Sequence, residues 1–463
     1  MSGDNSFRKN TMILTLGTLL NKGMQFLAIP FFSRWLSTGD YGRFDLYYTY
    51  VSLLLPIISL SIDDAVFRYC VETTDSNKQK SYLTNALAIN IFNLIIGITL
   101  IMAFVNQITL VVIAFCFYLA SEIFSQYLRG YLRGMKRLDL YSCAMVINTF
   151  IMIIAVTILV YYKKLGVEGI LFGYAIGTWG GNIIICLYSK LHKMINVLNL
   201  SVKIIKGMVS YSLPLVPNVL SWWIMNASDR QIINWYFGDQ ANGIYAIAHK
   251  IPALCSVVFN MFTISWQQDA TMRINDEDRN IYFNKIINEM YVILSIVCIG
   301  LFSCSFIFYH YIFDIKYSDA QLYSPIMILA AALMAISQFY GGIQIALKES
   351  KKNGFTTVLG AASNVLIHLI LIKYVGLFAA AISTLVGNYI ILVVRKKMLS
   401  KIFAPRYEKK NIYLIGILSY FFITAYVNQY LIFNIVNLFL ACLVACICGK
   451  EILKKVLVKT QIF

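Results

Sequence analysis

Fourteen apolar segments, each long enough to cross a lipid bilayer, run through the 463 residues of this chain and sort its basic residues. When the loops are assigned alternately to the two sides of a membrane, 30 of the 39 lysines and arginines fall on one side and six on the other, with three inside the segments. Basic loops of membrane proteins stay in the cytoplasm. The pattern therefore predicts an all-α, polytopic membrane protein with both termini cytoplasmic.

Composition supports a membrane environment and excludes a large soluble domain. Hydrophobic residues make up 59% of the chain and charged residues 13%, whereas a soluble chain carries about 25% charged residues. The net charge of +17 is scattered over the predicted cytoplasmic loops. We therefore expect these loops to contact anionic membrane lipids and not nucleic acid.

The positions of the spans follow from hydropathy, with about 20 apolar residues needed for each crossing. The first segment is too long for the apolar region of a signal peptide, so we expect it to remain as a span. The last hairpin is the weakest prediction; without it, twelve spans remain and both termini are still inside. We place the spans at about residues 11–33, 45–66, 82–104, 108–129, 140–162, 167–189, 208–236, 243–268, 286–313, 321–347, 354–372, 376–394, 411–428 and 431–449.

An internal repeat relates the two halves of the chain. Gly42-x-Phe44 and Gly243-x-Tyr245 occur 201 residues apart, each between an outward and an inward span. Spans 1–6 and 7–12 have the same orientation, as in the parallel repeats of transporters, whose substrate site lies between the halves. The repeat predicts two six-helix lobes around a central cavity, with a C-terminal helix pair added. We expect the first lobe at residues 1–200 and the second at residues 201–400. Residues 401–463 should form a basic cytoplasmic loop, the final hairpin and the tail.

Prolines gather in the helix pairs that the repeat makes equivalent. Five of the seven lie in spans 1, 2, 7 and 8: Pro30, Pro56, Pro214, Pro217 and Pro252. A proline frees a backbone carbonyl that lipid cannot satisfy. These helices are therefore either kinked for packing or bent around a cavity.

Three cations inside the spans are the candidates for binding an anionic substrate: Lys22, Arg230 and Lys250. A charge at the centre of a membrane costs about 2.5–3.5 kcal/mol on insertion scales and usually faces a cavity. Lys22 either reaches across to Glu122 or waits in the cavity for an anion. Arg230 and Lys250 lie in spans 7 and 8.

Four carboxylates inside the spans are candidates for coupling transport to an ion: Asp63, Asp64, Glu122 and Asp229. The structural alternatives are a salt bridge between Asp229 and Lys250, and an interfacial cluster of Asp63 and Asp64 with Arg68. Nothing in the sequence chooses between a proton and sodium.

Other features indicate packing. Four glycines at four-residue spacing in span 6 share one helix face and predict close helix contact: Gly169, Gly173, Gly177 and Gly181. His310 and His368 stand alone, and we expect them to be satisfied within the bundle. The ten cysteines lie mostly in apolar runs without metal-ligand neighbours. No nucleotide-binding loop or hydrolase motif occurs, so we expect neither an enzyme nor a metal or other cofactor.

Two segments carry a resemblance to a known family. Residues 17–69, and residues 212–251 with Pro214, the Ser228-Asp229-Arg230 triplet and Gly243-x-Tyr245, resemble the polysaccharide-transport branch of the multidrug/oligosaccharidyl-lipid/polysaccharide exporter superfamily. The resemblance covers most of the chain and is specific at these two segments. Members of this branch include the Wzx-type O-antigen flippases.

The resemblance implies a function and a place in the cell. It implies a flippase in the bacterial cytoplasmic (inner) membrane that moves a polyprenyl-pyrophosphate-linked oligosaccharide by alternating access, with other polysaccharide-assembly proteins as partners. Two rival functions remain open. A drug/cation antiporter of the same superfamily would need an acidic cavity, and a membrane glycosyltransferase or polymerase would need a sizeable loop outside the membrane.

Overall fold

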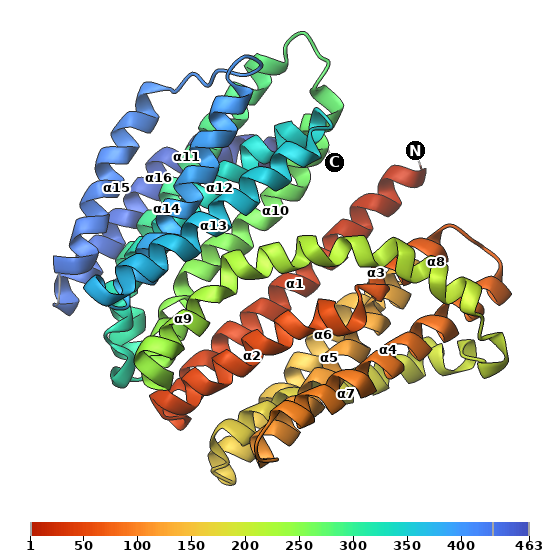
Figure 1. The fold of residues 1–463 in the computed structure, drawn as a ribbon. Coiled ribbons are helices and arrows are strands. Elements are labelled where there is room, and N and C mark those ends of the chain that lie inside the picture. Colours follow the sequence, from red (N-terminus) through yellow and green to blue (C-terminus); the bar gives the residue numbers. More distant parts are fainter. Residues whose placement is uncertain (1, 428–429, 462–463) are drawn as a thin grey trace. The chain divides into compact units, whose positions relative to one another are not determined.

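The computed structural model describes residues 2–427 and 430–461, and within these ranges the chain is helical with no strand (Figure 1). Because a membrane offers no hydrogen-bonding partners, each crossing segment must satisfy its own backbone, and the α-helix does so. The predicted all-α fold is confirmed.

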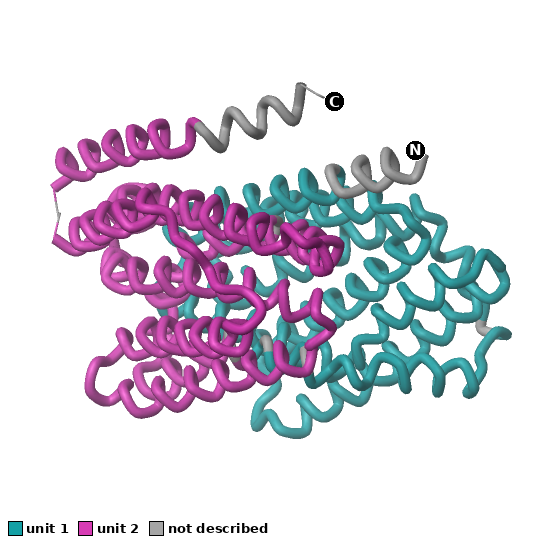
Figure 2. Tube along the Cα trace, turned by 90° about the horizontal axis from the view of Figure 1, so that it is seen from above, with its two compact units in different colours: residues 1–223 teal, residues 224–463 magenta. Residues whose placement is uncertain are grey.

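The chain divides into two compact units, Met1–Trp223 and Ile224–Phe463 (Figure 2). The predicted lobes, bounded near residues 200 and 400, stay predictions. Unit 1 contains α1 Ser2–Trp35, α2 Thr38–Ser59, α3 Ile62–Val71, α4 Ser76–Phe104, α5 Leu110–Gly134, α6 Leu138–Val156, η1 Thr157–Tyr162, α7 Gly166–Ser189, η2 Leu191–Met194, η3 Val197–Asn199, α8 Val202–Ser212 and η4 Leu213–Leu215.

Unit 2 begins within α9, a helix that breaks at Gly238, where φ is 75°. Its core is aromatic: Trp266 stacks on Phe339 with ring centroids 4.3 Å apart and donates its Nε1–H to the Phe339 carbonyl at 2.8 Å. The helices are α9 Val216–Ala248, α10 Lys250–Arg273, α11 Arg279–Ile307, η5 Phe308–Ile312, η6 Ile315–Tyr317, α12 Ala320–Ala346, α13 Ser350–Val375, α14 Phe378–Leu399, α15 Lys409–Val427 and α16 Leu431–Gln461.

The described helices include ten that are long and apolar enough to cross a membrane, or up to twelve if each of two bent pairs is one span. Within the described residues, each predicted span overlaps helical structure. The multi-pass architecture is therefore confirmed. The count of fourteen spans, the cytoplasmic termini and the cytoplasmic membrane itself stay predictions.

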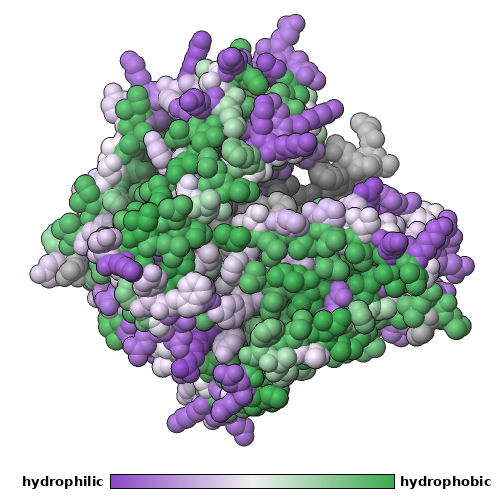
Figure 3. Space-filling view, in the orientation of Figure 1, coloured by the Kyte–Doolittle hydropathy of each residue, from purple (hydrophilic) through white to green (hydrophobic). Residues whose placement is uncertain are grey.

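Side chains are distributed as lipid contact requires. Large apolar residues of α4 are exposed, among them Phe92 and Leu100, whereas polar residues such as Asn85 and Asn90 of the same helix are buried. Apolar side chains cover much of the face shown in Figure 3, and hydrophilic ones gather towards its edges. A soluble protein would show the opposite distribution.

We expect a topology reporter fused within residues 190–206 or 395–410 to be cytoplasmic, and one within residues 163–166 to be outside. The reason is the sorting of basic loops. Paired fusions to a fluorescent protein and to a periplasm-activated phosphatase would measure this. Phosphatase activity from a fusion at residues 190–206 would contradict the topology.

A sharp break separates α2 from α3, which are bent by 54°. Leu60 and Ser61 both adopt left-handed conformations with φ of 52°. The break lies four residues after Pro56, in the helix for which the prolines predicted a bend. The Ile58 carbonyl beside the break accepts a hydrogen bond from Asn93 Nδ2 at 2.9 Å. The neighbouring helix therefore satisfies a backbone group that lipid could not.

The glycine face predicted in span 6 is a helix contact. A Cβ added at Gly173 would lie 2.9 Å from the Cα of Val156, and one at Gly177 would lie 2.5 Å from the Cα of Met152. Both neighbours belong to α6, so the missing side chains allow the backbones of α6 and α7 to approach.

We expect Gly177→Ala to destabilise the protein by about 3 kcal/mol, because the new methyl group meets backbone that cannot move aside. The thermal unfolding midpoint in detergent would measure this. Gly300→Ala in α11 is the matched control, since its Cβ would meet nothing within 4 Å and alanine favours a helix. Equal midpoints for the two variants would contradict the predicted contact.

Candidate functional site

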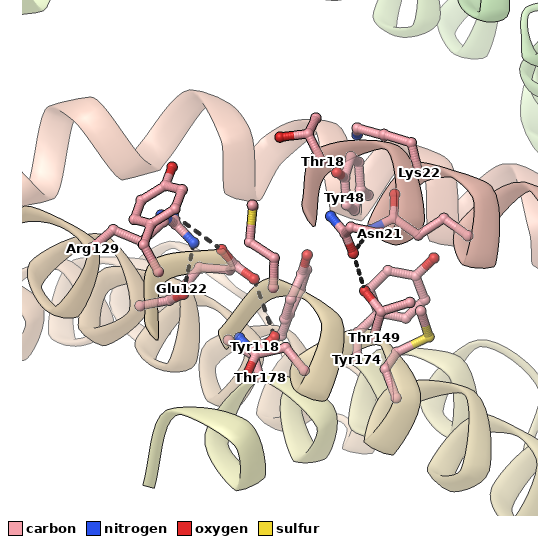
Figure 4. Close-up of a pocket in the computed structure, with 16 residues that line it drawn as sticks. Thr18, Asn21, Lys22, Tyr48, Tyr118, Glu122, Arg129, Thr149, Tyr174 and Thr178 are labelled. Atoms are coloured by element: carbon pink, nitrogen blue, oxygen red, sulfur yellow. Dashed lines mark hydrogen bonds and ion pairs between the residues drawn. The ribbon is translucent and has the colours of Figure 1, made fainter. Parts of the chain in front are cut away.

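A polar cavity of about 320 Å³ lies inside unit 1 among α1, α2, α5, α6 and α7 (Figure 4). Polar groups in the membrane are costly unless paired or facing water, so a polar cavity there marks a functional site. It is lined by Thr18, Asn21, Lys22, Gln25, Tyr48, Tyr118, Glu122, Ser125, Arg129, Tyr141, Met145, Asn148, Thr149, Met152, Tyr174 and Thr178.

α1 presents one face to this cavity. Thr18, Asn21, Lys22 and Gln25 follow the three- and four-residue spacing of one helix side. Asn21 Oδ1 accepts hydrogen bonds from Thr149 Oγ1 on α6 and from Gln25 Nε2, the latter at 3.4 Å. The bond from Thr149 ties α1 to α6 next to Lys22.

Lys22 is exposed and forms no ion pair with any side chain that the structure describes. Of the two interpretations of Lys22, the salt bridge to Glu122 is therefore not formed. An ammonium group on the wall of a cavity can donate three hydrogen bonds to an anion.

α5 contributes a charged pair to the opposite wall. Arg129 Nη2 lies 3.8 Å from Glu122 Oε2, and Arg129 Nη1 donates to Ser125 Oγ at 2.7 Å. Thr178 of α7 donates to Glu122 Oε1 at 3.1 Å. The cavity thus holds two cations, Lys22 and Arg129, against one carboxylate that is already engaged. Its lining is net positive.

Three tyrosines form an aromatic wall of the same cavity. Tyr48 of α2 stacks on Tyr118 of α5 with centroids 6.3 Å apart. Tyr174 of α7 meets both rings edge-on, at 6.1 and 5.7 Å. Such a wall offers apolar ring faces and phenolic hydroxyls side by side.

A second cavity of about 560 Å³ adjoins the first and shares Thr18 and Tyr141 with it. Arg133 and Lys136 line it. Arg133 lies 3.6 Å from Asp64 and 4.4 Å above the ring of Phe67. Arg129 and Arg133 lie on α5, and Lys136 follows two residues after its end, on the predicted cytoplasmic side. A row of positive charge therefore joins the two cavities.

Of the other predicted coupling residues, Asp63 and Asp64 lie in the first turn of α3. The expected cluster with Arg68 is not formed, because Asp64 pairs with Arg133 and Arg68 pairs with Glu72 at 2.9 Å. Helix α3 begins only after the break at Ser61, which turns its first residues towards α5.

Asp229 is buried in unit 2, and the salt bridge to Lys250, the structural alternative for this residue, is not formed. Asp229 accepts hydrogen bonds from Tyr245 and Thr384 and contacts His368. Arg230 lies on α9 and Lys250 at the start of α10. Each of the two side chains has an interaction partner. Since these residues belong to unit 2, a cavity shared with Lys22 stays a prediction.

Sequence reasoning missed two residues of these sites. The hydropathy pattern ends a span at Arg129 and so does not single this residue out, although it lies seven residues after Glu122 and thus on the same helix face. The sequence shows His368 as a solitary histidine. Its partner Asp229 is 139 residues away, and no local pattern joins them.

Comparison with solved structures defines the fold class. The structure of lipid II flippase MurJ in an inward closed conformation is 12% identical, with a TM-score of 0.74, and the match covers 96% of this chain and 100% of that one. An inward-facing MATE family transporter of the MOP superfamily is 14% identical, with a TM-score of 0.65, covering 83% and 95%. The chain has the fold of these membrane transporters.

Sequence comparison gives the family. Residues 7–266, more than half of the chain, match the family described as polysaccharide biosynthesis protein. The chain belongs to this family. A Haemophilus influenzae protein of the Lsg locus is 38% identical over 61 residues, which are 13% of this chain and 15% of that protein. The predicted membership of a polysaccharide family and the predicted fold are both confirmed.

Proposed function

We propose that the chain is a flippase that moves a polyprenyl-pyrophosphate-linked oligosaccharide, an O-antigen or similar repeat unit, across the bacterial cytoplasmic membrane by alternating access. The observation that carries the proposal is the net positive cavity of unit 1, with Lys22 on its wall outside any described ion pair. The family supports a role in polysaccharide assembly.

The chemistry of the cavity matches a pyrophosphate. Charges interact strongly where water is scarce, because the effective dielectric constant is low. Hydrogen bonds between an ammonium or guanidinium group and a phosphate oxygen are about twice as strong as neutral ones. Lys22 and Arg129 would hold the pyrophosphate. Arg133 and Lys136 would attract it first, on the predicted cytoplasmic side.

The aromatic wall suits the sugar next to the pyrophosphate. Ring faces of Tyr48, Tyr118 and Tyr174 can pack against the apolar face of a pyranose, and amphipathic aromatic residues combine such packing with hydroxyl hydrogen bonds. Asn21, Asn148 and Thr149 supply further polar groups. The part of the substrate that this cavity would bind therefore comprises the pyrophosphate and the first sugar.

The rival functions fit the cavity less well. A drug/cation antiporter would present unpaired carboxylates, but the one carboxylate lining this cavity is engaged by Arg129 and Thr178. A glycosyltransferase or polymerase is not supported by the transporter fold. We keep Asp63, Asp64 and Glu122 as candidates for ion coupling. Arg230 and Lys250 remain candidates for substrate contact, and other polysaccharide-assembly membrane proteins remain candidate partners.

Reconstitution would test the proposal directly. The purified full chain is placed in vesicles that contain a fluorescent polyprenyl-pyrophosphate disaccharide, and a membrane-impermeant reagent measures how much substrate becomes accessible. We expect the substrate to become accessible faster than in vesicles without the protein. A polyprenyl monoether, which has no pyrophosphate, should become accessible at the same rate with and without the protein. Uptake of a cationic dye without any flipping would instead support the antiporter.

A further inference from the structure

The segment that follows α7 exposes large apolar side chains outside any predicted span. This segment, residues 190–206, contains η2, η3 and the start of α8, and we call it the connector. Leu198 is 91% exposed, Val202 is 80% exposed and Leu200 is 49% exposed. Apolar side chains that gather on a surface mark a site of interaction. Because the connector lies between two spans, the hydrocarbon core of the bilayer does not account for their exposure.

The course of the connector is fixed by α4. Asn85 of α4 is fully buried, and its Nδ2 donates to the carbonyl of Asn199 at 2.9 Å. Its Oδ1 accepts from the backbone N–H of Ser201 at 2.8 Å. The backbone N–H of Asn196 donates to Thr84 Oγ1 at 3.0 Å. These bonds alternate along the chain with the exposed apolar residues, so the backbone that presents those residues is held in place.

The inner face of the same region is packed into unit 1. Helix α8 packs on α3 and α4 (Figure 1). Leu191 of η2 and Met208 of α8 are fully buried, in a cluster that includes Leu83 of α4 and Leu140 of α6. The region therefore has two apolar faces. One is covered by unit 1, and the other points away from it.

A loop of unit 2 is held in a similar way and does not share this exposure. Asn288 Nδ2 donates to the carbonyl of Arg406 at 2.8 Å, and Asn288 Oδ1 accepts from the backbone N–H of Glu408 at 3.0 Å. In that loop the large apolar residue Phe403 is only 2% exposed. An asparagine that holds a loop therefore does not force apolar side chains outwards. Their exposure is a property of the connector itself.

The charge of the connector indicates what covers its outer face. Within residues 190–206 there is no aspartate or glutamate, and four exposed lysines accompany the apolar side chains: Lys190, Lys193, Lys203 and Lys206. Apolar side chains among basic ones are typical of segments that lie in the interface of a membrane. Lysines near the cytoplasmic surface are attracted by its anionic lipids.

We propose that the connector is a membrane anchor. Leu198, Leu200 and Val202 enter the headgroup region of the cytoplasmic leaflet, and the lysines bind the phosphates of anionic phospholipids there. The connector begins directly after α7 ends at Ser189, so it lies within reach of the bilayer surface. An acidic protein would first have to displace these lipids. The anchor is independent of the proposed flippase function.

The anchor has a consequence for the helix that follows. The chain runs from the connector through α8 and η4 into α9, and unit 1 ends within α9 at Trp223. An interfacial segment holds its position through both buried apolar area and attraction to anionic lipid. The connector would therefore fix the depth in the membrane at which α9 begins.

Photo-crosslinking in nanodiscs identifies what contacts the connector. The full chain carries Leu198→benzoylphenylalanine, in nanodiscs of phosphatidylcholine and phosphatidylglycerol in equal amounts, and mass spectrometry identifies the adducts. We expect adducts with phosphatidylglycerol to exceed those with phosphatidylcholine at least about fivefold, the factor that one lysine near an anionic surface contributes. Leu100→benzoylphenylalanine in α4 is the matched control, because Leu100 is exposed within a predicted span. It should form adducts with both lipids equally.

The charge of the connector is tested separately. In the triple variant Lys193→Gln, Lys203→Gln and Lys206→Gln, residue 198 should still form adducts with lipid but without preference for phosphatidylglycerol. The control is Lys163→Gln with Lys164→Gln, two exposed lysines between η1 and α7. This control should keep the preference, since these residues lie on the opposite predicted side of the membrane.

Three outcomes would overturn the anchor. One is the absence of lipid adducts at residue 198 while residue 100 forms them. Another is a preference for phosphatidylglycerol that is missing from the wild type or unchanged in the triple lysine variant. The last is an adduct with a protein in place of lipid when the crosslinking is repeated in intact cells. If the variant at residue 198 unfolds in a melting curve, Val202→benzoylphenylalanine replaces it with the same expected adducts.

Discussion

Lys22→Ala should reduce flipping of the lipid-linked oligosaccharide by about tenfold to 100-fold, the range that corresponds to one hydrogen bond between charged groups, about 1.5–3 kcal/mol. The ammonium group lines the cavity and forms no ion pair within the described structure. Its loss should therefore remove a substrate contact without leaving a buried partner uncompensated. The initial flipping rate in vesicles, normalised to protein content, measures the effect.

Lys22→Arg and Lys163→Ala serve as controls for this prediction. Arginine keeps the positive charge, so Lys22→Arg should retain part of the activity. Lys163 is an exposed residue at the end of η1, and its replacement by alanine should have no effect. Flipping by Lys22→Ala at the wild-type rate would show that Lys22 does not bind the substrate. An equal loss in Lys163→Ala would point to a general effect of removing a cation.

The helices were predictable from the sequence because the membrane imposes them. A crossing segment must be apolar, of fixed length and helical, so hydropathy alone located the long apolar helices. Helix breaks were less predictable. Pro56 indicated a bend in span 2, but the change of direction occurs at Leu60 and Ser61. That position depends on Asn93 of the next helix, a tertiary contact that hydropathy does not encode.

The candidate sites were predictable where a charge stood alone in an apolar helix. Lys22 and Glu122 were found this way, since such charges are costly and rare. Their partners were not found. Arg129 lies at the end of its span, where basic residues are ordinary, and His368 contacts Asp229 across 139 positions. Pairing between helices depends on how the helices pack within each unit, and a single sequence does not record this packing.

Arg129→Gln should lower flipping by about tenfold or more, because it leaves Glu122 as an uncompensated carboxylate and reduces the cations of the cavity to Lys22 alone. Loss of one partner of a partly buried charged hydrogen-bonded pair has effects of this size. The flipping rate of the full chain in vesicles measures it, and the unfolding midpoint in detergent excludes a folding defect as the cause.

The double variant Glu122→Gln with Arg129→Gln separates two roles of the arginine. If Arg129 serves only to neutralise Glu122, the double variant flips at the rate of Glu122→Gln alone, since Lys22 still faces the substrate. If Arg129 also binds the pyrophosphate, the double variant is slower than Glu122→Gln alone, although its cavity has the same net charge as that of the wild type. We expect the second result, because the Nη1 bond to Ser125 at 2.7 Å and the contact with Glu122 hold the guanidinium group at the cavity wall. A planar donor fixed in this way is suited to bidentate contact with phosphate oxygens, and equal flipping by the double variant and by Glu122→Gln alone would exclude that contact.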